Sequence, residues 1–395
     1  MSDASGGAFA GGTPLLRDVV DAMQARYRPE WAMSWDPVGL TCGDPGAAVS
    51  AVHFALDASP AVVDEAIAGN AQLLITHHPL LFTSVSSVAA DTPKGASIHR
   101  LISAGCALFS AHTNADRARP GVSDALADAL GLIDTAPLES LPSEPLDKVV
   151  VFVPVADEQV VIDAMAAAGA GSIGDYSRCA WSSTGTGTFR PESGAQPTIG
   201  AVGAIEVVAE ARLEMVVPRL ARHAVVAAMR SAHPYEEPAF DVFELADVET
   251  SAGLGRVGRL RQPQPLGSFV ERVASVLPVG AGGVRASGDP ARMISTVAVC
   301  GGAGSSALDA VGRRDAGIDA YVTGDLSHHT AGEFIDAVGP LGPVLIDATH
   351  FGTEWPWLPQ AAALLVADLA ELGTTVEVTV STLPTDPWRM HAGGN

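Results

Sequence analysis

A short apolar run, Leu73–Thr76, ends in two adjacent histidines and a proline, His77-His78-Pro79. A run of this length, with Asn70 before it and Pro79 after it, is typical of a buried strand in an open α/β sheet. Ligands of such sheets bind outside the carboxyl ends of the strands. The side chains of neighbouring strand residues point to opposite faces of the sheet. His77 and His78 can therefore serve one site only if the strand ends at them. Pro79 ends the strand there. The run therefore predicts a functional site at this edge of the sheet.

Three other predicted strands end in polar residues of the same chemical kind. These residues are His112 with Asp116, then Asp325 with His328 and His329, and finally His350 with Glu354. Imidazole and carboxylate groups are the usual protein ligands of divalent transition metals, and four chain segments can surround an ion without strain. The set exceeds what one tetrahedral ion needs, so we expect two ions about 3.5–4 Å apart, bridged by a carboxylate. Glu354 is the candidate bridge, and Asp116 is the alternative.

Each of these motifs also has a purely structural interpretation. A lone His-His-Pro sequence most often only ends a strand, and Asp57 and Asp347 are expected to cap loops. His53 and His99 fit ordinary packing or surface positions. The glycine-rich segment Gly301–Ser306 can cradle a phosphate with its backbone N–H groups, but strand-to-helix turns also need glycine for packing alone. The convergence of four strand ends is what favours a metal site.

Length and composition indicate a globular chain of more than one domain. At 395 residues the chain exceeds a single ordinary core, and 23 basic against 45 acidic residues give a net charge of -22, which disfavours nucleic-acid binding. The four cysteines form no C-x-x-C pair, and residues 1–12 lack the features of a signal peptide. The most apolar helical stretch, Pro359–Leu372, is too short to span a bilayer. We therefore expect a soluble, cytoplasmic protein without membrane contact.

The order of the predicted elements divides the chain into segments. They are a disordered lead-in over residues 1–12, a first α/β half over 13–145, an insert over 146–250, a second α/β half over 251–385 and a tail over 386–395. The two halves alternate strands and helices, which predicts parallel sheets that together form one metal-binding core. The insert has a β-α-β-β-α-β order, with one strand expected near Ile199–Val202. This order favours a small ferredoxin-like α+β domain.

Sequence motifs from Thr13 to about Thr385 carry a resemblance to a known family. They are Trp35-Asp36-Pro37-Val38-Gly39-Leu40, Thr76-His77-His78-Pro79, His112-Thr113-Asn114-Ala115-Asp116, Thr323-Gly324-Asp325 with His329, and His350-x-x-x-Glu354. Together they resemble the NIF-three-like dinuclear metal-centre hexamers, many of which carry the label GTP cyclohydrolase 1 type 2 homologue. The insert, through Gly169–Tyr176, Gly185–Pro191 and His233–Pro238, resembles that of the family's long form, which is similar to PII and CutA signalling folds.

The resemblance implies a particular site and assembly. The metal ligands it implies are His77, His78, Asp116, His350 and Glu354, holding two divalent ions (Zn, Fe, Mn or Ni) per subunit, with His329 and Asp325 lining the pocket as catalytic residues. It also implies a toroidal homohexamer that acts on a small molecule, of the nucleotide class or related to it. No ligand position departs from the family pattern. Phe351 stands where an aromatic residue with a hydroxyl is common.

The resemblance implies a hydrolase similar to GTP cyclohydrolase 1 type 2. In such a hydrolase we expect a metal-activated water to attack the substrate and His329 to be the general acid. The alternative is a metal-binding regulatory or metal-handling hexamer without turnover, which the likeness of the insert to PII-type domains favours. Formate release from GTP separates the two. In the insert, His233, Glu236 and Glu237 lie between two prolines, so we expect a rigid surface turn rather than a second metal site. The insert itself is expected to act as a lid.

Overall fold

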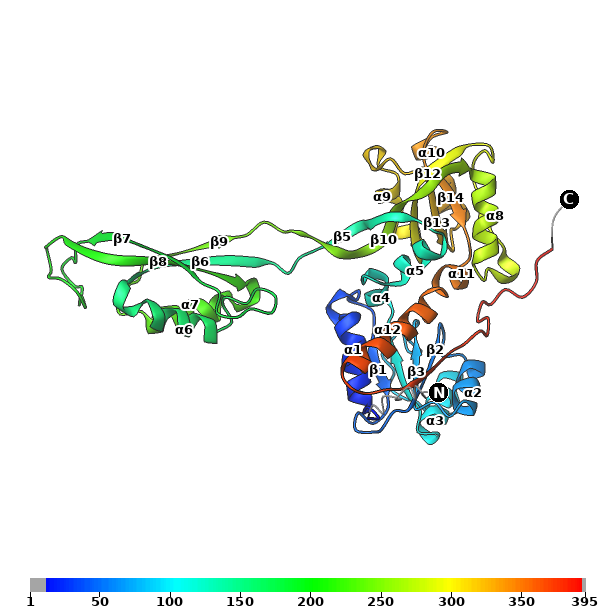
Figure 1. Cartoon of the computed structure of the whole chain (residues 1–395), viewed down its shortest axis with the longest axis horizontal. Coiled ribbons are helices and arrows are strands. Elements are labelled where there is room, and N and C mark those ends of the chain that lie inside the picture. Colours follow the sequence, from blue (N-terminus) through cyan, green and yellow to red (C-terminus); the bar gives the residue numbers. More distant parts are fainter. Residues whose placement is uncertain (1–11, 393–395) are drawn as a thin grey trace, which may run out of the picture. The chain divides into compact units, whose positions relative to one another are not determined.

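The computed structural model describes residues 12–392, which form two compact units (Figure 1). The core unit comprises the residues up to Leu141 and from Ser251 onward, and the insert unit comprises Pro142–Thr250. The lead-in predicted over residues 1–12 lies almost wholly outside the described residues. Its last residue, Gly12, pairs with Thr374 in a parallel β-bridge.

The first sheet of the core unit holds the strand that ends in the two histidines. Its strands, in spatial order, are β1 (Gly39–Cys42), β4 (Ala107–Ser110), β3 (Leu73–Thr76), β2 (Ala51–Ala55) and β15 (Glu377–Val380). All are parallel to their neighbours except β1. Two pairs of helices cover its faces, α2 (Pro60–Ala68) with α3 (Pro93–Ser103), and α1 (Leu16–Arg26) with α12 (Trp357–Glu371). Every residue of β3 is buried, as the apolar run predicts.

The second sheet of the core unit contains six strands. In spatial order they are β11 (Arg285–Ala286), β14 (Val344–Asp347), β13 (Ala320–Gly324), β12 (Met293–Ala303), β10 (Glu249–Pro265) and β5 (Ile133–Pro142). Strands β12, β13 and β14 are parallel. Helices α5 (Val122–Ala129) and α8 (Leu266–Val276) pack on one face, and α9 (Leu308–Val311) and α10 (His328–Val338) on the other. The glycines Gly301 and Gly302 belong to β12 and not to a turn after it.

Each half of the core contributes a strand or helix to the sheet of the other half. Dividing the chain at residues 145 and 251 does not separate the two sheets. Strand β5, from the first half, is an edge strand of the second sheet, while α12 and β15, from the second half, pack on the first sheet. Strand partners depend on tertiary contacts that local patterns do not encode. The predicted fold class is nevertheless confirmed, because two α/β halves form one core that carries an inserted α+β unit.

The insert unit is a four-stranded antiparallel sheet with two helices on one face (Figure 1). Its elements are β6 (Leu146–Pro154), α6 (Glu158–Ala167), β7 (Trp181–Phe189), β8 (Glu206–Pro218), α7 (Arg222–Ala232) and β9 (Phe240–Glu244). The spatial order β7-β8-β6-β9 is that of a ferredoxin-like domain, as predicted. The strand expected near Ile199–Val202 is wrong, because that segment is loop and the Gly/Ser/Thr-rich stretch before it forms β7.

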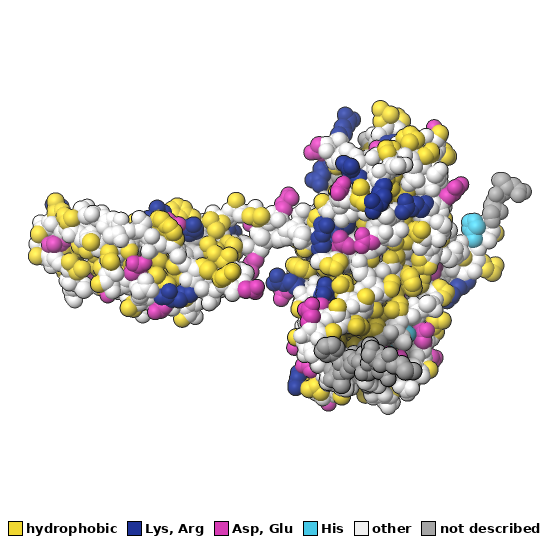
Figure 2. Space-filling model, viewed as in Figure 1, with side chains coloured by type: hydrophobic (Ala, Val, Ile, Leu, Met, Phe, Trp, Pro, Cys, Tyr) yellow, Lys and Arg dark blue, Asp and Glu magenta, His cyan; other side chains and the backbone are white. Residues whose placement is uncertain are grey.

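The surface and the helices bear on two further expectations. No helix within residues 12–392 is long and apolar enough to cross a membrane. On the face seen in Figure 2, Lys and Arg side chains lie scattered among acidic and apolar ones.

Candidate metal centre

The polar residues that follow three strands of the core unit, β3, β4 and β14, meet at one place. His77 and His78 follow β3 directly. After β4, His112 is the N-cap of α4 (Thr113–Arg117), which carries Asp116. After β14, the short helix α11 (His350–Glu354) has His350 at its first position and Glu354 at its last, one turn apart, so both side chains face the same side.

The Glu354 carboxylate lies at the centre of this group. Its Oε1 is 3.0 Å from His350 Nε2 and 3.5 Å from His77 Nε2, and its Oε2 is 3.2 Å from His78 Nε2. The Nε2 atoms of His78 and His350 are 3.2 Å apart, and His77 Nε2 is 3.6 Å from Asp116 Oδ1. Donors about 2.0–2.1 Å from a tetrahedral ion lie about 3.4 Å from one another, so these spacings fit shared ligation of metal.

Every histidine of the group is oriented by an oxygen at its Nδ1 atom. The pairs are His77 with the Ala111 carbonyl at 2.8 Å, His78 with Asp57 at 2.8 Å, His112 with Asp36 at 3.0 Å and His350 with Asp325 at 2.8 Å. Carbonyl and carboxylate oxygens only accept hydrogen bonds, so the proton sits on Nδ1 in the neutral rings. The Nε2 lone pairs are then free to face the centre, which is how metal-binding histidines are commonly held.

The charges in this group depend strongly on one another. Burial opposes ionisation of Glu354, yet the imidazoles of His78, His350 and His77 hold its pKa well below its usual range. Burial also opposes protonation of His78 and His350, but Glu354 and the carboxylate at each Nδ1 raise their pKa values to about 10 and about 11. Since no Lys or Arg within the described residues lies at ion-pair distance from Glu354, only these imidazoles balance its charge.

The outer carboxylates respond to the same histidines. Burial works against ionisation of Asp57, but its hydrogen bond from His78 lowers its pKa. The hydrogen bond from His350 likewise lowers the pKa of Asp325. Asp116 differs, because burial outweighs the attraction of His77 and raises its pKa. Asp57 and Asp325 are therefore held as anions, and each accepts the Nδ1 proton of its histidine, His78 or His350.

Two buried atoms of the centre lack hydrogen bonds within the described part of the chain. His77 Nε2 has no partner, and Glu354 Oε2 makes no hydrogen bond of acceptable geometry although His78 is near. Buried polar atoms are normally paired, and each exception needs an explanation. Nitrogen and carboxylate donors that converge without a counter-charge fit divalent metal ions, so the residues present suit the ions that the sequence predicts.

The donors fall into two overlapping groups. One consists of His77, His78 and His112, and the other of His78, His350 and Glu354, and in each the donor atoms lie within 4.8 Å of one another. Because His78 belongs to both, the arrangement is suited to a dinuclear site. His112 is an addition to the predicted ligand set, whereas Asp116 reaches the centre through His77.

The backbone around the centre is constrained. Thr349, the N-cap of α11, has φ +63°, a conformation that a β-branched residue rarely adopts, and its hydroxyl accepts a hydrogen bond from Gly352 N. Asp325 also has a positive φ, +56°. Gly302 is required because a Cβ there would enter the Glu354 carboxylate. Its N–H donates to Thr353 Oγ1 and is therefore not free to bind a phosphate.

The two predicted catalytic residues occupy different positions. Asp325 lies against His350, as its hydrogen bond shows. His329 is exposed in the first turn of α10, where its ring contacts His328, and no hydrogen bond or ion pair joins it to the centre within the described residues. Phe351 is buried beside the centre and offers no hydroxyl there.

Sequence reasoning undervalued three residues of the centre. Asp57 was expected only to cap a loop, but it orients His78. Asp36, in the Trp-Asp-Pro motif, orients His112 and also accepts a hydrogen bond from Thr113 N at 2.9 Å. His112 lies at a predicted strand end but is not among the ligands that the family resemblance implies. Two features of the sequence could have pointed to these acids. Asp57 comes shortly after a predicted strand, and Asp36 lies in a motif that had no assigned role.

A pocket of about 970 Å³ opens beside His78 and His350. Gly282, Gly283 and Arg285 line one part of it, and Trp388 belongs to the C-terminal segment that lines another. The volume suits a small-molecule ligand. Arg285 is the only Lys or Arg among the lining residues.

The chain is similar to several known proteins over most of its length. The chain is 52% identical over 376 residues to a Mycobacterium tuberculosis protein named GTP cyclohydrolase 1 type 2 homolog, covering 95% of this chain and 97% of that protein. A Bacillus subtilis protein of the same name is 41% identical over 324 residues, 82% of this chain and 85% of that one. The crystal structure of a Bacillus cereus protein related to NIF3 matches with a TM-score of 0.72 and 36% identity, covering 95% of this chain and 99% of the other. Residues 14–387 match the family Duf34/NIF3 (NGG1p interacting factor 3), and the chain belongs to that family.

Proposed function

We propose that the chain is a dinuclear metal-dependent hydrolase of the GTP cyclohydrolase 1 type 2 kind, acting on a nucleotide or a related small molecule. The observation that carries the proposal is the convergence of imidazole Nε2 atoms on the buried Glu354 carboxylate with two donor atoms left unpaired. The name shared by the Mycobacterium tuberculosis and Bacillus subtilis relatives supports the choice of reaction.

The roles of the residues follow from their positions. His77, His78, Asp116, His350 and Glu354 would hold the two ions, and His112 would join them. When bound, such ions acidify a water and polarise the bond under attack. Asp57 and Asp325 keep the Nδ1 protons of His78 and His350 in place, so their Nε2 lone pairs face inward. His329 as general acid remains a prediction.

The pocket beside the centre supports a substrate with an anionic group and a flat part. Arg285, whose side chain is 73% exposed and pairs with Asp347 at 2.5 Å, supplies the cationic group, while the exposed indole of Trp388 supplies an aromatic surface. The ring of a purine nucleotide and its phosphates would match these two features. We further propose that the active form is a homohexamer of cytoplasmic location.

The decisive experiment measures metal content per chain together with formate release from GTP. About two ions per chain and formate are expected from the wild type. His350→Ala should abolish formate release, because the variant loses a donor that is 3.0 Å from Glu354. The matched control is His99→Ala on the exposed side of α3, which should keep both metal and turnover.

Other outcomes would count against the proposal. Two ions with unchanged GTP would favour the alternative, a metal-handling or regulatory scaffold. Full turnover by His350→Ala would exclude the assigned site, and wild-type protein without metal would contradict the ligand assignment itself.

A further inference from the structure

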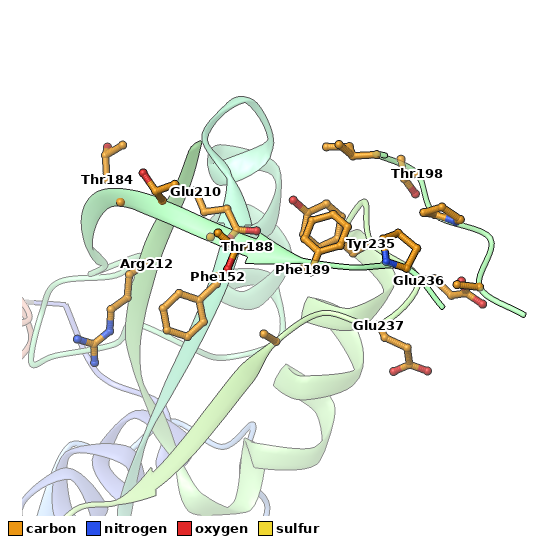
Figure 3. Close-up of a pocket in the computed structure, with 18 of the residues that line it drawn as sticks. Phe152, Thr184, Thr188, Phe189, Thr198, Glu210, Arg212, Tyr235, Glu236 and Glu237 are labelled. Carbon is orange, nitrogen blue, oxygen red and sulfur yellow. The ribbon is translucent and has the colours of Figure 1, made fainter. Parts of the chain in front are cut away.

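The insert unit contains a pocket of about 670 Å³ that the metal centre does not explain (Figure 3). Its floor is the open face of the sheet, opposite the helices, where Phe152 of β6, Gly185 of β7 and Glu210 of β8 lie. Residues Pro191–Ile199, in the loop after β7, and the turn Tyr235–Ala239 form its walls. A volume of this size suits a small organic ligand.

Hydrogen bonds fasten the loop to the turn and keep the pocket formed. Thr198 Oγ1 donates to the Pro234 carbonyl at 2.7 Å, and Gln196 N donates to Glu236 Oε2 at 3.0 Å. His233 Nε2 donates to the Phe152 carbonyl at 2.9 Å, and its Nδ1 accepts from Tyr235 N at 3.1 Å. Both ring nitrogens of His233 are thus used in the wall of the pocket. These hydrogen bonds fasten the turn, which forms one wall of the pocket.

Three aromatic side chains line the pocket. Phe189 and Tyr235 pack with their ring centroids 5.5 Å apart, and Phe152 lies on the floor, apart from this pair (Figure 3). The Tyr235 hydroxyl is buried and makes no hydrogen bond that meets ordinary distance and angle limits within the described residues. Burial and the neighbouring Glu210 carboxylate raise its pKa to about 12. Aromatic faces attract both flat rings and organic cations.

The charges of the pocket are unbalanced toward the negative. Arg212 is paired with Glu214 at 2.9 Å, and Glu237 is paired with Arg230 at 3.1 Å. Glu210 has no basic partner among the residues that the structure describes, and its carboxylate leans over the backbone of Gly187, where any Cβ would collide with it. A half-buried carboxylate beside aromatic rings, without a counter-ion of its own, provides a place for a cation.

The glycine at position 185 leaves room for such a ligand. Gly185 is directly opposite Glu210 in the β7–β8 ladder, and a Cβ built on it meets no atom within 4 Å. Since its φ is not positive, a larger residue at this position would be tolerated by the backbone and would project into the pocket.

We propose that this pocket binds a small organic cation, an arylalkylammonium ion whose ring packs on the Phe189–Tyr235 pair and whose ammonium group pairs with Glu210. The ring buries apolar surface against these two aromatic residues. The N–H groups of the ammonium ion donate to the Glu210 carboxylate, beside which the Tyr235 hydroxyl lies. This binding site is independent of the proposed hydrolase activity, because all of its residues belong to the insert unit.

The test titrates the full-length, metal-loaded protein with phenethylammonium, followed by isothermal calorimetry and by saturation-transfer NMR of the ligand. The neutral isostere 2-phenylethanol and the anion 3-phenylpropionate are the comparison probes. We expect the cation to bind at least tenfold more tightly than the alcohol and the anion not to bind. Glu210→Gln should reduce the affinity for the cation at least tenfold but leave that for the alcohol unchanged.

Filling the pocket provides an independent check. Gly185→Leu should abolish binding, whereas Ala209→Leu, an exposed position on β8 outside the pocket, should preserve it. Circular dichroism and thermal melting of both variants verify that the insert remains folded. The proposal is overturned if the wild type does not bind phenethylammonium, if cation and alcohol bind equally, or if folded Gly185→Leu binds as the wild type does.

Discussion

Arg256 and Glu354 are both charged and buried in the core unit, but their surroundings differ. The Arg256 guanidinium is 0% exposed and donates five hydrogen bonds, two to Asp124 and one each to the carbonyls of Ala118, Gly253 and Gly255. A guanidinium has five N–H groups, so every one is used. This network is closed by protein atoms alone.

Glu354, at 3% exposure, is surrounded by imidazoles and leaves one of its own oxygens and His77 Nε2 without hydrogen bonds. An isolated buried carboxylate is costly unless something completes its surroundings. The difference teaches how to distinguish the two kinds of buried charge. A network in which all donors and acceptors are paired stabilises the fold, whereas one that leaves converging lone pairs is built to hold something that the chain itself does not supply.

The largest effect on stability is expected from a substitution of Arg256, whose hydrogen bonds to Asp124 and three carbonyls form the closed network. Arg256→Met should lower the free energy of unfolding of chelator-treated protein by about 3–5 kcal/mol, because it leaves Asp124 buried without its counter-charge and takes a donor from three buried carbonyls. Urea denaturation measures this change. Arg259→Met, on the same strand but 65% exposed and 3.9 Å from Asp134, is the control and should cost less than about 0.5 kcal/mol. Equal effects of the two variants would refute the view that Arg256 closes a structural network.

The next largest effect on stability is expected when metal binds the group of imidazoles around Glu354, called the open cluster below. Divalent ion at a hundred times its dissociation constant should stabilise the wild type by about 2.7 kcal/mol over chelated protein. Glu354→Gln should remove this response, since Glu354 lies within 3.5 Å of three imidazole nitrogens. Thermal melting with and without metal measures it. Glu65→Gln, which alters a carboxylate paired with His53 outside the centre, should retain the response. A Glu354→Gln protein that metal still stabilises would show that the open cluster is not the binding site.

The sequence predicted the donors of the open cluster better than the groups that position them. Histidines and acids just beyond strands can be recognised locally, because parallel strands bring their carboxyl ends to one edge. The partners that orient them are far away along the chain, as Asp36 is from His112 and Asp325 from His350. No spacing rule connects such pairs. They could be identified only once the fold had brought them together.

The fold shows the same limit. The sequence predicts strands over the apolar runs Ala107–Ser110 and Val344–Asp347, and the buried strands β4 and β14 have these bounds. The long strand β10 was missed because it is rich in glycine, a residue that usually argues against a strand interior. Its Gly253 and Gly258 are needed because the backbone of β5 approaches so closely that a Cβ would collide with it. Glycine at these positions is required by the contact between β10 and β5, which cannot be recognised from the sequence alone.

A smaller effect on metal affinity is expected at a residue that contacts a partner of the open cluster and not the cluster itself. Thr385, near the C-terminus, donates a hydrogen bond from its hydroxyl to Asp57, which in turn accepts one from His78 Nδ1. Thr385→Val should lower metal affinity by up to about tenfold, at the weak end of the effect of such outer partners. Competition with a chromogenic chelator measures the affinity. Thr385→Ser keeps the hydroxyl and should restore it, and a serine variant as weak as the valine variant would assign the loss to packing instead.

Removing the insert should leave both buried networks intact. Every donor and every Nδ1 acceptor of the cluster, and all partners of Arg256, lie outside Pro142–Thr250. Deletion of Leu146–Ala246 spares β5 and β10, which are neighbours in the second sheet, and the hydrogen bond from Ser143 N to the Val248 carbonyl holds the new ends together. The shortened chain, closed by a short Gly-Ser linker, should take up the same amount of metal per chain as the full protein and lose similar stability on Arg256→Met. An insoluble or metal-free product would mean that the insert contributes to the core's buried charges, and the contrast between a closed and an open network could then no longer be drawn within the core unit alone.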